Sequence, residues 1–261
     1  MGDNDGRARR VAVVTGGATG IGLATVSRLA AAGWRVAFFN HRAAEVAAAE
    51  RHIGSRFPAT EFLGATVDLR DEAGVRSFFA TAADHWGPVG ALVSNAGFVP
   101  PRRPTGRTPL AEIPVGEWND VLRVNLTGGF LACQCVLPGM VAERFGRIVF
   151  IGSVGARAIS EIAGASYGAS KAALTALARS IVSEYSEHGI TANTICPGRI
   201  VTGMTGPADS AGNLAAARLI RVRRLGEPDE IARVAEFLVS PDSGFISGAV
   251  IDVNGGEFSP P

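Results

Sequence analysis

The chain has 261 residues, of which 47% are hydrophobic and 19% charged, and its formal net charge is +1. This composition is typical of a globular protein and excludes an intrinsically disordered one. A net charge so close to zero provides no field that would attract nucleic acid or a membrane surface, so we expect neither as a partner. The length suits a single α/β domain with a large sheet.

Residues 1–10 are polar at the start and lack the apolar core of a signal peptide. We therefore expect a short disordered tail, followed by one catalytic domain over residues 11–261 in a cytoplasmic protein. No stretch approaches the roughly 18 uninterrupted apolar residues of a membrane helix. The three cysteines and four histidines form no ligand or disulfide pattern, which predicts an enzyme without a metal.

Apolar runs of strand length alternate with helical segments along the chain. The predicted strands are residues 11–14, 35–39, 62–67, 91–94, 147–151, 190–195 and 249–253. The predicted helices cover residues 21–32 and 43–56, a segment ending at residue 85, residues 116–126, an apolar segment reaching residue 144, and residues 165–181. Strands that are apolar throughout indicate a parallel sheet covered on both faces. We therefore predict an α/β fold: a Rossmann-type, doubly wound, mostly parallel seven-stranded sheet in a single domain.

Two loops interrupt this rhythm, and each follows the carboxyl end of a strand, where open α/β sheets bind ligands. Residues 98–114 hold five prolines together with Arg102, Arg103 and Arg107. As a hypothesis, this basic loop closes over the substrate and contacts an anionic group; alternatively its arginines are merely solvated. Residues 200–219, rich in Gly, Ala and Ser, are expected to form the second loop.

A glycine-rich turn separates the first strand from its helix. It reads Thr15-Gly16-Gly17-Ala18-Thr19-Gly20-Ile21-Gly22, with the spacing G-x-x-x-G-x-G. Glycines at a strand–turn–helix junction let backbone amides approach a pyrophosphate, which the helix N-terminus also favours. The turn therefore predicts a dinucleotide site contacted by Gly16, Ala18, Thr19, Gly20, Ile21 and Gly22; the alternative is an ordinary tight turn.

Tyr167 and Lys171 are four residues apart in the predicted helix over 165–181. This spacing puts both side chains on one helix face. An ammonium beside a phenol stabilises the phenolate and lowers the tyrosine pKa from about 10 toward neutrality. The pair therefore predicts an acid–base group, although a surface tyrosine and a solvated lysine could share the same spacing.

Together these motifs resemble the short-chain dehydrogenase/reductase family over nearly the whole chain, from about Arg10 to Gly256. The resemblance rests on Thr15–Gly22, Asp68, Asn95-Ala96-Gly97, Asn125, Ser153, Tyr167 with Lys171, Pro197-Gly198 with Thr202, and Asp252-Val253-Asn254-Gly255-Gly256, in that order. It implies an NAD(P)-dependent oxidoreductase that exchanges a hydride with a carbonyl or a secondary alcohol. It also implies a homo-oligomer, a tetramer or a dimer.

The resemblance assigns four catalytic roles. Tyr167 is expected to exchange the proton with the substrate oxygen, and Ser153 to hydrogen-bond that oxygen. Lys171 is expected to lower the tyrosine pKa and to hold the ribose hydroxyls. Asn125 is expected to hold a water that relays protons; a structural asparagine at a helix bend is the alternative, and both roles can coexist.

The resemblance also extends the expected cofactor contacts. Asp68 and Leu69 would hold the adenine, and Ile200 and Thr202 the nicotinamide amide. The full set beyond the glycine-rich turn is Asn40, His41, Arg42, Asp68, Leu69, Asn95, Ala96, Gly97, Tyr167, Lys171, Pro197, Gly198, Ile200 and Thr202. Three departures from the family pattern are Ser94 in place of an asparagine, a Ser153-to-Tyr167 spacing one residue longer than the commonest, and Asn40 in place of aspartate.

The end of the second strand bears on the choice of cofactor. An aspartate there binds the ribose hydroxyls of NAD and repels a 2′-phosphate, whereas Asn40 removes that repulsion. His41 and Arg42 follow at once, and an arginine suits a phosphate. Against this, Thr19 stands where many NADP users carry a base. We expect NADP(H) to be preferred, with NAD(H) as the alternative.

Within the family the closest likeness is to 3-oxoacyl-carrier-protein reductases, through Ile151-Gly152-Ser153-Val154, Val124-Asn125-Leu126-Thr127 and Arg224-Leu225-Gly226-Glu227-Pro228. Many alcohol, sugar and steroid dehydrogenases share these stretches, so they leave the substrate open. Glu184 and Glu187 argue against docking an acidic carrier protein on the helix that follows Lys171. A non-catalytic NADP-binding regulator is the remaining alternative, but it predicts loss of Tyr167 or Lys171, and both are present.

Overall fold

The computed structural model describes residues 10–100, 107–159 and 164–260. Its centre is a seven-stranded sheet in the order β3-β2-β1-β4-β5-β6-β7, with every neighbouring pair parallel. The strands are β1 (Val11–Thr15), β2 (Arg35–Asn40), β3 (Phe62–Thr66), β4 (Val89–Ser94), β5 (Gly146–Ile151), β6 (Ile190–Pro197) and β7 (Val250–Val253). This confirms the predicted Rossmann-type, doubly wound fold. The predicted tail lies outside the described residues up to position 9.

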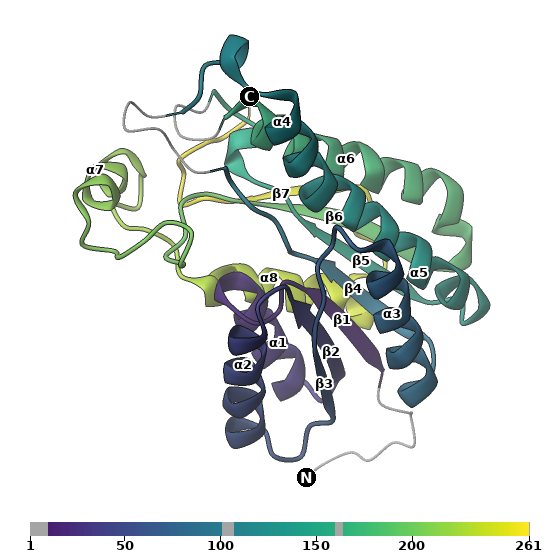
Figure 1. Cartoon of the computed structure of the whole chain (residues 1–261). Helices are drawn as coiled ribbons and strands as arrows, with labels where there is room; N and C mark the ends of the chain where they lie inside the picture. Colours follow the sequence, from purple (N-terminus) through teal and green to yellow (C-terminus); the bar gives the residue numbers. More distant parts are fainter. Residues whose placement is uncertain (1–9, 101–106, 160–163, 261) are drawn as a thin grey trace.

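Helices cover both faces of the sheet (Figure 1). They are α1 (Gly20–Ala31), α2 (Ala43–Arg56), α3 (Glu72–Trp86), α4 (Val115–Leu122), α5 (Gly128–Ala142), α6 (Ala165–Tyr185), α7 (Ala211–Leu219) and α8 (Pro228–Val239). The buried residues of α1, α2 and α8 belong to one hydrophobic core, and those of α3, α5 and α6 belong to a second.

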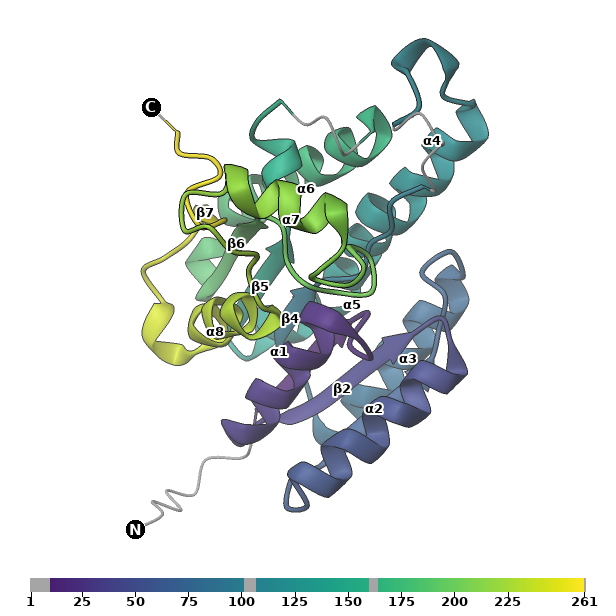
Figure 2. The same cartoon turned by 90° about the vertical axis from the view of Figure 1, so that its left-hand side faces the viewer.

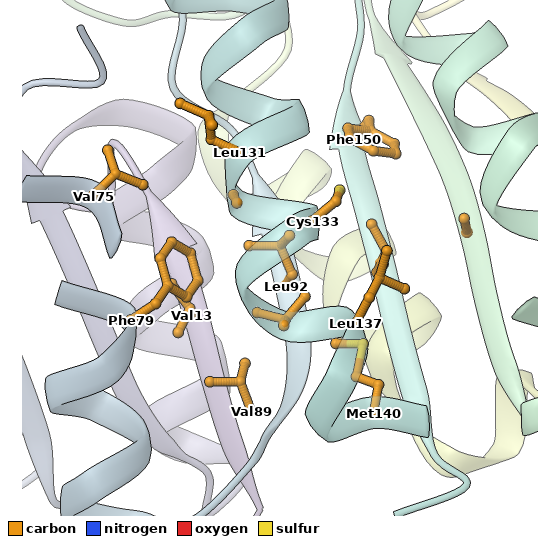
Figure 3. Close-up of a cluster of buried hydrophobic side chains, with 14 of the residues drawn as sticks. Val13, Val75, Phe79, Val89, Leu92, Leu131, Cys133, Leu137, Met140 and Phe150 are labelled. Carbon is orange, nitrogen blue, oxygen red and sulfur yellow. The ribbon is translucent and has the colours of Figure 1, made fainter. Parts of the chain in front are cut away.

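The two cores follow from the period-two alternation of the strands. In β1, Val11 and Val13 belong to one core, and Ala12 and Val14 to the other. Figure 3 shows the core around Val13, in which side chains of α3 and α5 pack over the strands. Burying each large apolar side chain contributes roughly 1.5–3 kcal/mol, so both faces of the sheet need a helical cover.

The prediction of a loop over residues 200–219 is wrong for its second half, because α7 occupies Ala211–Leu219. Ser210 caps this helix by accepting a hydrogen bond from the backbone of Asn213. Alanine-rich sequence favours a helix once the cap is supplied. In Figure 1, α7 protrudes from one side of the molecule, and in Figure 2 it lies on the side that faces the viewer.

Helix α8 was not predicted from the sequence, although the sequence contains the capping residues typical of a helix start. Glu227 and Glu230 form a capping box around Pro228, which occupies the first turn. The helix packs against α1, and Arg28 of α1 pairs with Asp229 at 2.6 Å and with Glu236 at 2.8 Å. The two helices on this face are therefore held by ion pairs as well as by apolar packing.

The helix predicted over residues 116–126 and the apolar helix predicted to follow it up to residue 144 form one continuous run. A π-helical turn over Arg123–Thr127 joins α4 to α5 in one helical run, Val115–Ala142. By length and composition this run could cross a membrane, but half of its most apolar window is buried inside the protein. Core helices of globular proteins have the same character.

Candidate active site

The glycine-rich turn is hydrogen-bonded to the segment that follows β4. The hydroxyl of Thr15 accepts hydrogen bonds from the backbone amides of Asn95 and Ala96, both at 3.0 Å. The side-chain amide of Asn95 donates in return to the carbonyls of Thr15 and Gly16, at 3.0 and 3.1 Å. The two loops that were expected to hold the cofactor are thus fixed to each other.

Three glycines of the turn have no room for a side chain, or have a backbone that disfavours one. Gly16 and Gly20 have φ angles of 63° and 52°, in the left-handed region. A Cβ on Gly22 would lie 2.1 Å from the carbonyl oxygen of Gly16. The N-cap residue of α1, Thr19, makes no side-chain capping bond, and the first turn has no acidic residue. The amides at this helix end are therefore available to an anion, and the turn fits a dinucleotide diphosphate.

Tyr167 and Lys171 lie in the first two turns of α6, beside the end of β5. The Lys171 ammonium donates to the carbonyl of Ile151 at 2.8 Å and lies 5.9 Å from the centroid of the Tyr167 ring. A Cβ on Gly97 would come within 2.9 Å of the Lys171 nitrogen, so this glycine keeps the lysine pocket open. The structure therefore brings together three of the predicted site residues.

The direction of the Tyr167 pKa differs from the one predicted from the spacing. Burial raises the pKa of Tyr167 above its ordinary value, and a hydrogen bond with Ser153 offsets part of that rise. Burial also lowers the pKa of Lys171 to about 8. The Lys171 ammonium donates to a backbone carbonyl and lies 5.9 Å from the ring centroid, so in this structure its charge does not lower the pKa of Tyr167.

Ser153 lies at the carboxyl end of β5, as predicted. Its hydroxyl accepts a hydrogen bond from the backbone of Gly155 at 3.0 Å and also bonds Tyr167. Ser153 therefore satisfies the loop backbone and contacts the tyrosine at the same time, while its predicted hydrogen bond to the substrate oxygen stays a prediction. Its own backbone N–H donates to the thiol of Cys196, a buried free cysteine that sequence reasoning did not connect with the site.

Asn125 lies in the π-helical turn and is buried. Its side-chain oxygen accepts from the backbone N–H of Phe98 at 2.8 Å, and its amide donates to the Phe98 carbonyl and to the Ser170 hydroxyl, both at 3.1 Å. Ser170 in turn donates to the carbonyl of Tyr167 at 2.7 Å. The structural role of Asn125 at a helix irregularity is therefore present, and Ser170, next to Lys171 in the motif, links it to the helix that carries the tyrosine.

At the end of β2, two of the three residues expected near the adenosine ribose contact a fourth residue, Glu45. Asn40 is buried and donates to Glu45 at 2.9 Å, while Arg42 pairs with the same carboxylate at 3.0 Å. The backbone N–H of His41 donates to the side-chain oxygen of Asn40 at 2.7 Å. Sequence reasoning missed Glu45, because its position three residues after Arg42 reads only as an ordinary helix-start carboxylate.

The side chains of the two residues expected at the adenine differ in whether a ligand could reach them. Asp68 is half exposed, pairs with Arg70 at 3.2 Å and accepts a hydrogen bond from the backbone of the same residue. Leu69 is buried in the core, and its side chain comes within 2.9 Å of a Cβ placed on Gly128. The Leu69 side chain is therefore committed to packing on α5, which leaves only its backbone for a ligand.

The segment after β6 is held by a small network. Gly198 bonds the backbone of Val253 at 3.0 Å, and the Thr205 hydroxyl donates to the carbonyl of Ile200 at 2.6 Å and accepts from the Thr202 amide at 3.0 Å. Thr202 faces the turn, since its methyl lies 3.2 Å from a Cβ placed on Gly20. The residues expected to contact the cofactor after β6 therefore lie at the same edge of the sheet as the glycine-rich turn. They are Pro197, which ends β6, Ile200 and Thr202.

Asn213 anchors α7 to this segment. It is fully buried, its amide donates to the carbonyls of Thr205 at 3.1 Å and Pro207 at 2.6 Å, and its oxygen accepts from Arg199 at 2.6 Å. Of the basic loop, Arg102 and Arg103 lie outside the described residues, and Arg107 is exposed. Within the described ranges no three His, Cys, Asp or Glu side chains gather in a way that could hold a metal ion.

A dinucleotide-binding turn beside a half-buried Tyr and Ser and a buried Lys, on a doubly wound sheet, is the arrangement of a nicotinamide-dependent oxidoreductase. The family model of the short chain dehydrogenases matches residues 10–212. The chain therefore belongs to the short-chain dehydrogenase family, and its enzymes exchange a hydride with carbonyl or alcohol substrates.

Similar proteins include two reductases of thioester substrates. The chain is 40% identical to the 3-oxoacyl-[acyl-carrier-protein] reductase MabA of Mycobacterium bovis, over 95% of this chain and 92% of that protein. It is 38% identical to the acetoacetyl-CoA reductase of Shinella zoogloeoides, over 95% and 98% of the two chains. Among solved structures, a blue fluorescent protein from a metagenomic library in complex with NADPH superposes with a TM-score of 0.86 at 31% identity, covering 96% and 98% of the two chains.

Proposed function

We propose that this enzyme reduces a ketone with NADPH, using Tyr167 as the proton donor. The observation that carries the proposal is the meeting of Tyr167, Ser153 and Lys171 beside the glycine-rich turn, with the Ser153 hydroxyl on the tyrosine and the lysine buried behind it. The bound nicotinamide supplies the hydride. In the reverse direction the same tyrosine removes the alcohol proton.

Each side chain then has a separate task. Ser153 orients the carbonyl oxygen of the substrate toward the Tyr167 hydroxyl, and Tyr167 delivers a proton to it. Lys171 holds the ribose hydroxyls and, as a cation, favours the tyrosinate left after transfer. Asn125 and Ser170 keep the tyrosine helix in register with the end of β4, and the water relay through Asn125 remains part of the proposal.

For the substrate we propose a 3-oxoacyl thioester as the first class to test. Support comes from the two relatives above, one named for 3-oxoacyl-carrier-protein reduction and the other for acetoacetyl-CoA reduction. Dehydrogenation of simple, sugar or cyclic alcohols is the second candidate, since a cis-4-hydroxycyclohexanecarboxylate dehydrogenase of Sinomonas cyclohexanicum is 36% identical over 95% of the chain.

The preference for NADP(H) rests on Asn40, His41 and Arg42 at the end of β2, and the NADPH complex of a similar protein supports it. NAD(H) is the alternative cofactor. We also propose that the protein works in the cytoplasm as a homo-oligomer, a tetramer or a dimer, in keeping with the family resemblance.

A turnover screen tests this function directly. Purified full-length enzyme is assayed with NADPH and with NADH against acetoacetyl-CoA, β-keto esters and cyclic ketones, following the loss of reduced cofactor. It is also assayed with NADP⁺ and with NAD⁺ against sugars and cyclic alcohols, following the formation of reduced cofactor. We expect the highest kcat/KM for NADPH with a β-keto thioester. A preference for oxidising sugars or cyclic alcohols would select the second candidate, and binding of cofactor without turnover of any class would select the regulator.

A further inference from the structure

We propose that Glu45 is a specificity-determining residue of the adenosine end of the site, and that its carboxylate limits the preference for NADP(H) over NAD(H). The inference rests on the proposed function, since it assumes that the cofactor ribose lies at the end of β2. It concerns a residue that neither the motifs nor the family pattern single out.

Both carboxylate oxygens of Glu45 are engaged by the residues expected at the ribose. Oε1 accepts from the Arg42 guanidinium at 3.0 Å, and Oε2 accepts from the Asn40 side-chain amide at 2.9 Å. The Glu45 side chain is 28% exposed, whereas that of Arg42 is 66% exposed. The carboxylate is therefore the better-fixed partner, and it holds both side chains.

The backbone keeps this carboxylate in place. Glu45 lies in the first turn of α2, and its amide donates to the carbonyl of Arg42, the N-cap residue, at 3.1 Å. A negative charge near a helix N-terminus is stabilised by the helix dipole. The position of Asn40 is fixed in turn, because it is buried and its oxygen accepts from the His41 amide.

Carboxylate and phosphate are alternative partners for the same N–H donors. A 2′-phosphate that pairs with Arg42 must take that guanidinium from Glu45, and it then lies close to a second negative charge. A ribose with a free 2′-hydroxyl meets no such repulsion and can donate a hydrogen bond to the carboxylate. Glu45 thus opposes Arg42: the arginine favours NADP(H), and the carboxylate favours NAD(H).

The same contacts change the role expected of Asn40. One of the two N–H groups of its amide donates to Glu45, so Asn40 acts on the cofactor through the position of the carboxylate as well as through its second N–H. The combined set of one arginine, one carboxylate and one amide predicts an enzyme that accepts both cofactors, with a smaller NADP(H) preference than Arg42 alone would give.

The test compares Glu45→Gln with wild type by titrating each full-length protein with NADPH and with NADH. This substitution preserves the size of the side chain and one of its two acceptor oxygens but removes its charge. We expect the Kd for NADPH to fall about three- to tenfold and that for NADH to stay level or rise, which is the range of a partly exposed ion pair. Glu45→Ala should move the ratio in the same direction. The matched control is Glu61→Gln, which removes the carboxylate that pairs with Arg35 at 3.1 Å at the opposite end of β2.

The outcomes separate this inference from the function on which it rests. If wild type binds either cofactor and Glu45→Gln leaves the NADPH-to-NADH ratio of Kd values unchanged, Glu45 has no part in selection, and the proposed function stands. Equal weakening of both cofactors would make Glu45 a structural residue and overturn the inference. If Glu45→Gln is unstable, Glu45→Ala provides the same comparison, because it also removes the charge. Failure of wild type to bind either cofactor overturns both proposals.

Discussion

The ammonium of Lys171 is bound to the carbonyl oxygen of Ile151 at 2.8 Å, while the centroid of the Tyr167 ring is 5.9 Å away. A buried lysine held by a neutral carbonyl has a strongly reduced proton affinity. Lys171 is also the one lysine in the sequence, so its ionisation can be followed without interference from any other lysine side chain.

This makes the Lys171 pKa directly measurable. In protein labelled with lysine carrying ¹³C at Cε, one side-chain signal is expected, and its titration in the absence of cofactor should give a pKa of about 8, compared with an ordinary 10.5. Burial of the cation is the physical cause. Because the folded-state pKa is depressed, the unfolded chain binds the proton more tightly, and stability should rise between pH 8 and 10.5. A midpoint near 10.5 would show that the ammonium is solvated.

The second prediction concerns the proton donor. Tyr167→Phe should bind the cofactor as wild type does but lose at least about a hundredfold in kcat, the usual contribution of a positioned acid–base group. Tyr185→Phe, at the other tyrosine of the chain, is the matched control and should retain full turnover. Turnover of Tyr167→Phe within a few-fold of wild type would remove this residue from the mechanism.

The third prediction concerns cofactor choice. Arg42→Ala should reduce the preference for NADPH by roughly ten- to a hundredfold, because a charge-assisted contact to the 2′-phosphate is lost. The sequence alone suggests adding Asn40→Asp to favour NAD. The structure argues against that combination, since the new aspartate would place a second carboxylate against Glu45, which accepts from the Asn40 amide at 2.9 Å.

Parallel titrations of wild type and Arg42→Ala with NADPH and NADH provide the measurement. Arg51→Ala, on the exposed side of the same helix, is the control and should leave both Kd values unchanged. Equal affinity of wild type for both cofactors, together with no response to Arg42→Ala, would make Arg42 a surface charge.

A fourth prediction tests the anchor of α7. Asn213→Ala removes a buried amide that donates to the carbonyls of Thr205 and Pro207. Leaving such groups unpaired costs about 1–3 kcal/mol each, so we expect the segment after β6 to loosen. The expected readout is a higher KM, together with faster hydrogen exchange over residues 203–220. Asn119→Ala, at an exposed position on α4, should change neither quantity.

The fifth prediction is a pH-dependent stability. Arg28 and Arg233 lower the pKa of Asp229 from 3.8 to about 2. A depressed carboxyl pKa adds stability that is present above the unfolded value and is lost as the pH falls toward the folded one. Asp229→Asn should therefore lower the free energy of unfolding by about 1 kcal/mol at pH 7, a figure reduced for solvent exposure, and by little near pH 2.

Urea unfolding of wild type and Asp229→Asn at pH 7 and near pH 2 measures this difference. Asp242→Asn removes an exposed carboxylate in the turn after α8 and serves as the control. A difference between wild type and Asp229→Asn that is the same at both pH values would mean that the carboxylate charge is not its source.

Much of the fold could be predicted because the buried strands are recognisable as short, continuously apolar runs of sequence. Runs such as Val11–Thr15 are apolar at nearly every position, which only a sheet covered on both faces explains. The end of the chain was harder to interpret. The helix Ala211–Leu219 follows a stretch of Gly and Ser that reads as loop, and its start depends on one capping serine.

Those residues of the candidate site that belong to sequence motifs could be predicted. The residues Tyr167, Lys171 and Ser153 meet because one helix and one strand end carry them. Local spacing cannot reveal what lies beside each of them. The Ile151 carbonyl under Lys171 and the carboxylate of Glu45 between Asn40 and Arg42 both depend on tertiary placement, and so does the direction of each pKa shift.

The ion pairs between α1 and α8 have a consequence for how the protein is made. Arg28 and Asp229 are 201 positions apart, so the helix that follows the glycine-rich turn is synthesised long before the helix that covers it. At about 5–20 residues per second, a ribosome needs roughly 10–40 s to bridge that interval. Throughout this time the apolar side of α1 lacks its final cover, so we expect the nascent chain to depend on chaperones there. A chain ending before Pro228 would keep every residue expected to contact the cofactor but would lack both α8 and the edge strand β7.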